Sequence, residues 1–315
     1  MAQLRSFDSA DVHRLASMDT AIAALRQCFA AGPTHIRRSQ HAAAGGELML
    51  MPAVDANAAG IKLLMIQPKN LLRGTPNIQG TYVLFDADAG HPVALLDGAA
   101  LTNIRTPAVS AVATDALARA DVRSLGIIGT GPQADGHVEA MLAVRPSLDD
   151  IVVASRSADS AAATVARIAA LPGVPKSVRV RVGTNADAAA CDILCTATRC
   201  IEPIVTAAMV RPGTHINAIG AYRTDMRELS TDLIAACTVT VDDVSAAHDE
   251  AGDLALAIAD GGWAWDRVAG DLAAIAAGRV RRTSDDEITL FKSVGLAVED
   301  LVIARIVAAS ENLLS

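Results

Sequence analysis

Leu125-Gly126-Ile127-Ile128-Gly129-Thr130-Gly131-Pro132-Gln133-Ala134 is the stretch that decides the fold. An apolar strand runs into a glycine turn, and helical spacing after the turn predicts a helix over 132–145, which the next proline ends. The spacing G-x-G-x-x-A is the pattern of turns that bind dinucleotides. Gly129 permits the tight turn, Gly131 lets a pyrophosphate approach the backbone, and Ala134 lets the helix pack closely on the strand.

The residues after this turn also indicate a dinucleotide site. A glycine turn alone would be weak evidence for one. A second apolar strand, 150–154, is followed by Ser155-Arg156-Ser157. Sites for NAD usually carry an acid at this strand end for the ribose hydroxyls, whereas an arginine accommodates the 2′-phosphate of NADP. Because no Asp or Glu stands there, we expect NADPH as the cofactor, with NADH possible. The alternative role for Arg156 is that of a solvent-facing loop residue.

Further apolar strands extend the same sheet, at 178–182, 192–198, 216–220 and 238–241. Helices are expected among and after them, at 160–170, 246–259 and 266–277. Ligands of such sheets bind beyond the carboxyl ends of the strands, which places Thr196, Thr198 and Ile219 near the cofactor.

Composition bounds the remaining possibilities. The length of 315 residues corresponds to about two domains at ~150 residues each. The net charge of −8 comes without a basic cluster, so we do not expect nucleic acid as a partner. Apolar runs are short and interrupted, which argues against a membrane span, and residues 1–14 lack the apolar core of a secretory signal. We therefore expect a cytoplasmic protein.

The five cysteines do not have metal-ligand spacing. Cys191, Cys195 and Cys200 lie near one another without a C-x-x-C pair or a neighbouring histidine. We interpret them as buried thiols in and after a strand and expect no metal site. Reduced cysteines also fit a cytoplasmic setting.

The chain before the glycine turn has a different pattern. A helix is expected over 17–31, and strands without helices between them follow at 35–40, 47–51, 60–67, 81–86 and 92–96. Gly45-Gly46 and Asp88-Ala89-Gly90 predict hairpin turns, so the sheet should be antiparallel or mixed. The stretch 288–309 is read as one final amphipathic helix docked on this part. We expect an α/β fold, with a Rossmann-type domain over 116–287 and a second α+β domain made from 1–115 and 288–315.

Two basic side chains in the first part suggest chemistry. Lys62 lies in a strand that is apolar on both faces, and a buried lysine is costly unless an anion accompanies it. Its alternatives are a pocket lysine facing a substrate anion or a lysine that extends to water from an edge. Arg37 and Arg38 are adjacent, so only one of them can enter a shared pocket.

Arg105 precedes a Thr-Pro pair that predicts a helix start. Thr106 would cap that helix and Pro107 would be its first residue. Arg105 would then lie at a helix N-terminus, where a cation opposes the helix dipole unless an external carboxylate or phosphate sits between them. A structural salt bridge to Asp or Glu is the alternative.

Four stretches in this order make the chain resemble the ornithine cyclodeaminase/mu-crystallin family. They are Ile104-Arg105-Thr106-Pro107-Ala108-Val109-Ser110-Ala111, the glycine turn from Gly126 to Ala134, Asn217-Ala218-Ile219-Gly220-Ala221-Tyr222-Arg223-Thr224-Asp225-Met226-Arg227-Glu228-Leu229, and Thr289-Leu290-Phe291-Lys292-Ser293-Val294-Gly295-Leu296-Ala297-Val298-Glu299-Asp300. Ala251-Gly252-Asp253 adds a weaker match.

The resemblance implies a set of functional residues. Substrate contacts would come from Arg37, Lys62 and Arg105, with Lys62 and Arg105 catalytic. Arg37 is chosen over Arg38 on the resemblance alone. The cofactor contacts would be Thr106, Gly129, Gly131, Pro132, Gln133, Ala134, Ser155, Arg156, Ser157, Thr196, Thr198, Ile219 and Ser293. The resemblance also implies a homodimer formed through the non-Rossmann domain, which would carry the substrate.

One departure from the family pattern indicates which branch of the family this chain resembles. Cyclodeaminases carry Gly-Asp after the Ile-Gly of this strand, and that Asp is their acid/base, whereas this chain has Ala221-Tyr222. The following Arg223 to Leu229 instead resembles ketimine and pyrroline-2-carboxylate reductases. We therefore expect NAD(P)H-dependent reduction of a small cyclic imino acid, giving proline or pipecolate. A cyclodeaminase, an alanine-dehydrogenase-like enzyme and a non-catalytic NADP(H)-binding protein are the alternatives.

Overall fold

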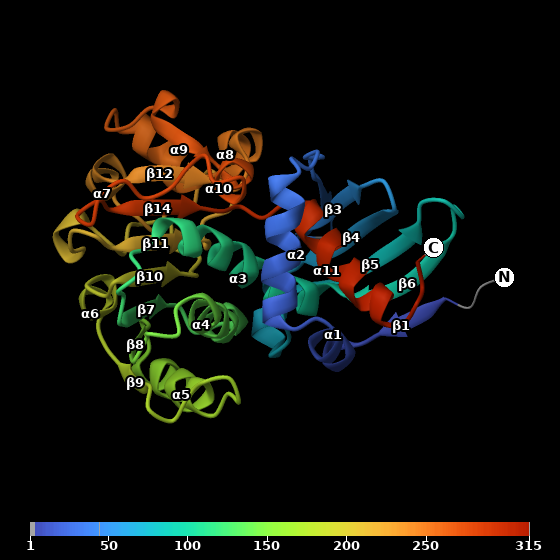
Figure 1. The fold of residues 1–315 in the computed structure, drawn as a ribbon, viewed down its shortest axis with the longest axis horizontal. Helices are drawn as coiled ribbons and strands as arrows, with labels where there is room; N and C mark the ends of the chain where they lie inside the picture. The colour runs from blue at the N-terminus through green and yellow to red at the C-terminus, as the bar shows by residue number, and fades with distance from the viewer. Residues whose placement is uncertain (1–3, 44, 315) are drawn as a thin grey trace. The chain divides into compact units, whose positions relative to one another are not determined.

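The computed structural model describes residues 4–43 and 45–314, and their contacts divide the chain into two compact units (Figure 1). The first unit takes residues up to Thr106, apart from Phe29–Ala31, together with Leu296–Ser315. The second takes Phe29–Ala31 and Pro107–Gly295. Each unit has its own sheet and core, so they are described separately.

The first unit is built on a mixed six-stranded sheet in the order β1-β6-β5-β4-β3-β2. Its strands are β1 (Arg5–Phe7), β2 (Ser39–Ala43), β3 (Gly46–Val54), β4 (Ala58–Ile66), β5 (Ile78–Asp86) and β6 (Pro92–Asp97). Neighbours from β2 to β6 pair antiparallel, and β1 pairs parallel with β6. The expected strand over 35–40 is wrong, because β2 begins at Ser39 and the residues before it are irregular.

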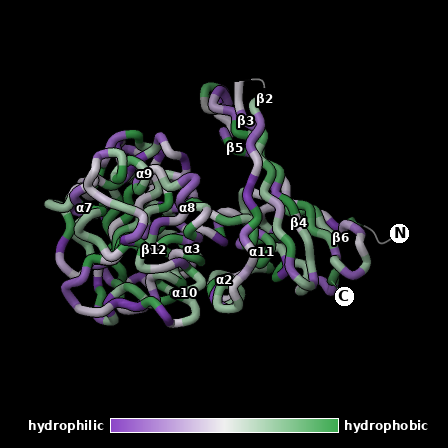
Figure 2. Tube along the Cα trace, turned by 90° about the horizontal axis from the view of Figure 1, so that it is seen from above, coloured by the Kyte–Doolittle hydropathy of each residue, from purple (hydrophilic) through white to green (hydrophobic). Residues whose placement is uncertain are grey.

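This unit also contains α1 (Ser9–Leu15), α2 (Met18–Ala30) up to Cys28, the part of α3 (Gly98–Leu117) up to Thr106, and α11 (Ala297–Ser310). The last packs against β3 and β4, as Figure 1 shows in red. Alternate residues of β3, among them Met49 and Met51, are buried under the helices, while Leu48 and Val54 on the other face stay exposed. Figure 2 shows apolar residues, in green, along the strands of both units.

Helix α3 (Gly98–Leu117) begins earlier than its sequence indicates. Asp97 accepts a hydrogen bond from the backbone N–H of Ala100 and so provides the cap. Pro107 therefore lies inside the helix instead of starting it, and Thr106 is not the cap. The Thr-Pro signal is misleading here because a proline removes only one helical hydrogen bond, which twenty residues of buried helix can tolerate.

The second unit contains an eight-stranded sheet in the order β13-β12-β14-β11-β10-β7-β8-β9, in which every pairing is parallel. Its strands are β7 (Ser124–Ile128), β8 (Asp150–Ala154), β9 (Arg179–Val182), β10 (Ile193–Thr196), β11 (His215–Ala218), β12 (Thr238–Val241), β13 (Val268–Asp271) and β14 (Thr289–Lys292). The order reverses between β7 and β10, as in a Rossmann fold.

Helices cover both faces of this parallel sheet. They are α4 (Pro132–Val144), α5 (Ala158–Ala169), α6 (Asn185–Ala189), α7 (Thr231–Ala236), α8 (Val244–Glu250), α9 (Gly252–Ala259) and α10 (Leu272–Ala276), with short 3₁₀ turns η2 (Ala207–Met209) and η3 (Trp265–Arg267); another turn, η1 (Pro68–Arg73), lies in the first unit. Figure 1 shows α4 and α5 on one face of the sheet and α6 on the other. Two-sided burial explains why its strands are nearly continuous apolar runs.

Two predicted helices are partly strands. The stretch 288–309 is not one helix, because Thr289–Lys292 forms β14 between β11 and β12, and α11 starts only after Gly295, whose φ is +85°. Likewise, 266–277 contains β13 before the short helix α10. Buried parallel strands lack polar alternation, so their sequences resemble buried helices.

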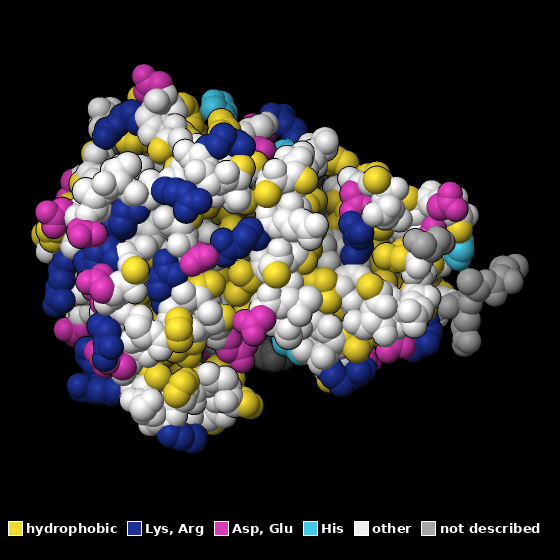
Figure 3. Space-filling model, viewed as in Figure 1, with side chains coloured by type: hydrophobic (Ala, Val, Ile, Leu, Met, Phe, Trp, Pro, Cys, Tyr) yellow, Lys and Arg dark blue, Asp and Glu magenta, His cyan; other side chains and the backbone are white. Residues whose placement is uncertain are grey.

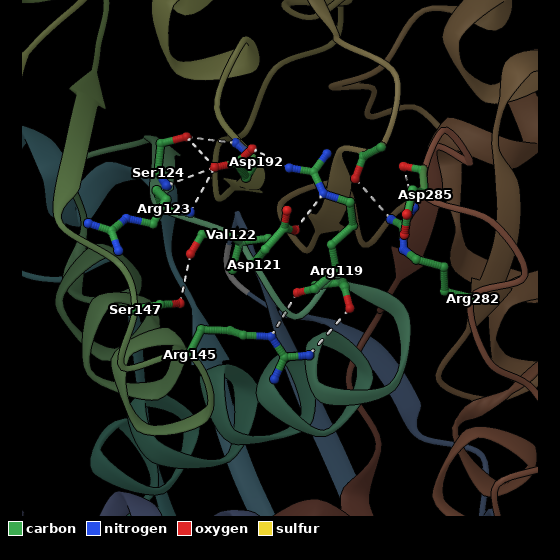
Figure 4. Close-up of polar contacts among 12 residues, drawn as sticks. Arg119, Asp121, Val122, Arg123, Ser124, Arg145, Ser147, Asp192, Arg282 and Asp285 are labelled. Atoms are coloured by element: carbon green, nitrogen blue, oxygen red, sulfur yellow. Dashed lines mark hydrogen bonds and ion pairs between the residues drawn. The ribbon is translucent and has the colours of Figure 1, made fainter.

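Arginine side chains form hydrogen bonds and ion pairs at the amino edge of the parallel sheet (Figure 4). Arg145 donates to the carbonyl oxygens of Thr114, Asp115 and Ala118 and so closes the end of α3. The Asp192 carboxylate accepts from the backbone N–H groups of Arg123 and Ser124, and these hydrogen bonds hold its pKa below the usual range against the opposing effect of burial. This edge of the sheet is thus held together by ion pairs and hydrogen bonds within the protein.

Among the described residues, no helix combines the length and the apolarity needed to cross a lipid bilayer. On the face shown in Figure 3, basic and acidic side chains are interspersed over the second unit.

Candidate functional site

The turn between β7 and α4 has a shape suited to a phosphate ligand. Gly129 adopts a φ of +131°, and a Cβ there would come within 2.7 Å of the carbonyl oxygen of Ala197, so the backbone itself requires glycine. Gly131, at the cap of α4, has an ordinary φ of −78°, and nothing in the structure lies within 4 Å of an added Cβ. Neither backbone strain nor protein packing explains glycine at this second position. Gly131 therefore leaves open space at the start of α4, where the first N–H groups of a helix point outward.

The other expected cofactor residues of this unit follow neighbouring parallel strands. Ser155, Arg156 and Ser157 follow β8, and Ser157 caps α5 by accepting from the N–H of Ser160. Arg156 is exposed and makes no hydrogen bond or ion pair with the residues that the structure describes. A guanidinium group at this strand end is therefore available to a phosphate.

Thr196 and Thr198, at the end of β10, are held by a residue that sequence reasoning did not assign. Glu228 is fully buried and accepts four hydrogen bonds. Its Oε2 accepts from Thr196 Oγ1 and from the N–H of Gly220, both at 2.8 Å. Its Oε1 accepts from the N–H and the Oγ1 of Thr198, both at 2.7 Å. One carboxylate thus joins the carboxyl ends of β10 and β11.

A second carboxylate supports the loop that carries Glu228. Asp253 Oδ1 accepts from the N–H groups of Glu228 and Leu229 at 2.7 and 2.9 Å. Its Oδ2 lies 3.1 Å from Lys292 Nζ, which also donates to the carbonyl oxygen of Ala218. Asp253 and Lys292 are both fully buried. Burial, followed by the charge of Asp253, raises the pKa of Glu228, and Lys292 opposes that rise.

Ser293 follows β14 and is buried against a third acid. The hydroxyl of Ser293 and the N–H groups of Val294 and Gly295 all donate to Asp242 Oδ2. The end of β14 is thereby fixed beside β12. Ile219, in turn, follows β11 and donates its N–H to the carbonyl oxygen of Thr196.

The first unit holds a separate cluster of buried charges. Lys62, on β4, is 1% exposed, and its Nζ donates to both carboxylate oxygens of Asp300 at 2.8 and 2.7 Å and to Thr102 Oγ1 at 3.1 Å. Burial lowers the pKa of Lys62 to about 8, although the charge of Asp300 opposes that shift. The lysine therefore does not extend to water, and it has the anionic partner that its burial requires.

Arg105 joins this cluster from α3. Its Nη1 donates to Glu299 Oε2 at 2.7 Å, and its Nε lies 3.8 Å from Asp300 Oδ1. Arg105 does not lie at a helix N-terminus, so that prediction is wrong, because α3 starts at Gly98. The predicted alternative, a salt bridge to an acid, describes the contact that is present. Lys62, Arg105, Glu299 and Asp300, here called the charge quartet, bring two cations and two anions together.

The remaining predicted residues of the first unit lie differently. Thr106 is buried, and its Oγ1 has no hydrogen-bond partner among the described residues. Arg37 is exposed in the irregular segment before β2, whereas Arg38 is half-buried. The contacts described for the charge quartet do not include Arg37, so its role as a substrate contact stays a prediction.

Four of the buried acids were quoted in the sequence without a role: Glu228, Asp253, Glu299 and Asp300. A signal for the last two was available, because adjacent acids open an otherwise apolar helix. The hydrogen-bond partners of Glu228 and Asp253 have no such signal in the sequence, because only the folded loop brings them together.

The structure holds no group of three or more His, Cys, Asp and Glu residues suited to a metal within the part of the chain that it describes. The cysteines are free, and Cys191, Cys195 and Cys237 are buried. Burial raises the pKa of the Cys195 thiol to about 12, which leaves it unreactive.

Comparison with known proteins agrees with this geometry. The family model for the ornithine cyclodeaminase/mu-crystallin family matches residues 8–314. A Delta(1)-pyrroline-2-carboxylate reductase of Bacillus cereus is 39% identical over 82% of this chain and 79% of its own.

Two solved structures superpose on nearly the whole chain. One is Delta(1)-pyrroline-2-carboxylate reductase of Thermococcus litoralis in complex with NADH and L-proline, with a TM-score of 0.90 and 30% identity over 99% of both chains. The other is an archaeal alanine dehydrogenase dimer with bound NAD, with a TM-score of 0.90 and 30% identity over 99% of this chain and 98% of that one. The Rossmann-type sheet, the glycine turn and the match over almost all residues lead to one conclusion: this chain belongs to the ornithine cyclodeaminase/mu-crystallin family.

Proposed function

We propose that this chain reduces the C=N bond of small cyclic imino acids by hydride transfer from NADPH, with Δ1-pyrroline-2-carboxylate and Δ1-piperideine-2-carboxylate as substrates. The observation that carries the proposal is the buried charge quartet. Relatives of the chain bear the name of this activity, and a solved relative binds NADH and L-proline, the product of the five-membered ring.

The charge quartet suits a substrate that is itself a zwitterion. It contains two positive and two negative side chains, so it can pair with both charges of a zwitterion. An iminium carboxylate has a net charge of zero. Its carboxylate can pair with Arg105 and Lys62, with Arg37 as a further contact, while its iminium nitrogen is attracted to the acids.

Lys62 is the proposed proton donor. Hydride addition to the iminium carbon leaves an amine nitrogen that takes up a proton near neutral pH. A lysine with a pKa of about 8 is mostly protonated at pH 7, yet gives up its proton far more readily than an ordinary lysine. Asp300 accepts from Lys62 through both of its oxygens and so holds the ammonium group in place.

The second unit is the proposed cofactor site. The residues at the glycine turn and at the ends of β8, β10, β11 and β14 would hold a nicotinamide dinucleotide, which supplies the hydride when bound. Gly131 leaves room for the pyrophosphate, and Arg156 offers its guanidinium group to the 2′-phosphate. This arginine supports NADPH over NADH.

A homodimer through the first unit is also proposed. The face of the six-stranded sheet turned away from α11 carries partly exposed apolar side chains, including Leu48, Val54 and Leu63. Contiguous apolar surface of this kind marks protein interfaces. A second copy of the chain is the proposed occupant, since a relative of the same fold is a dimer. Leu63→Glu should convert the dimer to a monomer in light scattering, and an unchanged mass would contradict this interface.

A spectrophotometric assay with NADPH and NADH, each against both cyclic imines, tests the proposed activity. Oxidation of NADPH that depends on either imine supports it. Tight NADPH binding without turnover would instead support a non-catalytic binding protein.

Alanine dehydrogenase activity is the second candidate, because one solved relative carries that name. It predicts oxidation of NADH with pyruvate and ammonia. A cyclodeaminase is less well supported, since buried Ala221 and half-buried Tyr222 stand after Gly220 where that branch has its acid. It would release ammonia from ornithine.

A further inference from the structure

The buried acids beneath the carboxyl edge of the parallel sheet carry an excess of negative charge. Glu228 and Asp253 have one cation between them, Lys292, and all three side chains are fully buried. We propose that these three residues, here called the acid pair with its lysine, favour the oxidised, positively charged nicotinamide over the reduced ring. Glu228 is then a positioning and electrostatic residue of hydride transfer. This inference rests on the proposed cofactor site, though not on the identity of the imine.

The four hydrogen bonds that Glu228 accepts, together with the charge of Lys292, favour its ionised form, whereas burial and the charge of Asp253 raise its pKa. Two of its four donors, the N–H groups of Thr198 and Gly220, are backbone groups that can only donate. The Thr196 and Thr198 hydroxyls complete the set. The two backbone N–H groups cannot accept a proton, so the hydrogen bonds to the charged form oppose the rise in the pKa of Glu228 that burial causes.

Lys292 neutralises only part of the pair. Its ammonium group lies 3.1 Å from Asp253 Oδ2 and donates to the carbonyl oxygen of Ala218. Asp253 in turn accepts from the backbone of Glu228 and Leu229. One lysine and two carboxylates leave a net charge of −1 in a region without solvent contact, where it is weakly screened.

The position of this charge determines what it can act on. Glu228 joins the ends of β10 and β11, on the far side of the strand-order reversal from β8 and Arg156. In a doubly wound sheet a dinucleotide crosses that point, with one mononucleotide on each half. The half that ends in β10 and β11 receives the nicotinamide when the other half receives the adenosine. Because the ring gains a positive charge on losing hydride, a fixed negative charge there stabilises the developing product.

The test measures binding of the two cofactor forms without any imine. Dissociation constants for NADP⁺ and NADPH are determined by calorimetry for the full-length protein, for Glu228→Gln and for Asp253→Asn. Both variants should weaken NADP⁺ at least tenfold more than NADPH, the scale of one unit charge within about 12 Å in protein with an effective dielectric constant of ~20. A merely structural role would weaken both forms equally.

Two features keep the test decisive. Asp253→Asn leaves intact every hydrogen bond that Thr196, Thr198 and Gly220 donate to Glu228, so it carries the test if Glu228→Gln does not fold. Asp192→Asn is the matched control, because Asp192 also accepts from two backbone N–H groups but lies at the amino edge of the same sheet. It should leave the ratio of the two dissociation constants unchanged.

An equal loss of affinity for both cofactor forms in Glu228→Gln and Asp253→Asn, or no change in either, would overturn the proposal even if imine reduction is confirmed. Conversely, a shifted ratio stands even if no imine is reduced.

Discussion

Replacing Asp300 with asparagine should change both the pH profile and the stability of the protein through Lys62. The substitution keeps the size of the side chain and removes the charge that faces the lysine at 2.7 Å. An opposite charge at this range typically shifts a pKa by about 1–3 units. The pKa of Lys62, about 8 in the native protein, should therefore fall to roughly 5–7 in the variant.

The activity should follow the protonated fraction of Lys62. In the native protein, kcat/KM for Δ1-pyrroline-2-carboxylate with NADPH should fall as pH rises through about 8. In Asp300→Asn the same fall should occur about 1–3 pH units lower, so that activity at pH 7 is reduced but recovers towards pH 5. Steady-state measurements of kcat/KM between pH 5 and 9, on the native protein and on Asp300→Asn, follow both falls in activity.

The stability change has a definite sign. Below the pKa of the variant, Lys62 is protonated in both proteins, and loss of its buried partner should cost up to about 3–5 kcal/mol of unfolding free energy. Well above pH 8 the lysine is neutral in both proteins, so its contribution to the difference should shrink towards zero. Urea unfolding at pH 5.5 and 8.5 measures this contrast.

Asp55→Asn is the matched control for this experiment. Asp55 pairs with Arg305 within the same unit, but both side chains are partly exposed, so the loss should stay below about 1 kcal/mol with little pH dependence. If Asp300→Asn left the activity profile where it is in the native protein, Lys62 would not be the titrating group, and the proposed proton transfer would be refuted.

Three further outcomes are expected. Gly131→Ala should leave the melting temperature unchanged yet weaken NADPH binding roughly tenfold or more. Gly126→Ala should instead destabilise the fold, because its Cβ would lie 2.0 Å from a backbone carbonyl oxygen. Equal melting temperatures for the two variants would contradict this. Arg156→Ala should raise KM for NADPH about 10–100-fold with little effect on NADH, and a parallel loss for both cofactors would exclude a 2′-phosphate contact. Burial lowers the pKa of His137 to about 4 and that of His215 to about 3, so stability should fall as pH drops below 6.5, by up to about 1.4 kcal/mol per unit for each; His137→Asn should flatten the slope in acid unfolding.

The glycine turn and the parallel sheet could be predicted because their determinants are local. The strand before Gly129 and the helix after it lie within one short stretch, and β8 follows with the bounds expected for it. The ends of the sheet are different. β13 and β14 are buried strands of four residues each, and short apolar runs do not distinguish strand from helix.

The start of α3 shows a second limit. Asp97 and Thr106 are both acceptable caps in the sequence, and the Thr-Pro pair is the stronger local signal. The structure uses Asp97, because the earlier start adds residues 98–106 to the helix and buries Leu101 and Ile104. Tertiary burial outweighs the capping preference, which is worth only about 1 kcal/mol.

The candidate site divides in the same way. The cations Lys62 and Arg105 stand out in sequence because each is anomalous where it occurs, one in an apolar strand and one beside a Thr-Pro pair. Their partners Glu299 and Asp300 come from α11, more than 190 residues later for Arg105 and more than 230 for Lys62. No periodicity links residues at such separation. A buried cation in a sequence therefore indicates that an acid must exist, because an unpaired charge would cost several kcal/mol, but only the packed fold shows which acid it is.

The second unit shows the same limit, because Lys292 would have indicated one buried carboxylate and the structure supplies two. The second carboxylate adds to the negative charge at the carboxyl edge, where Asp242 is also buried.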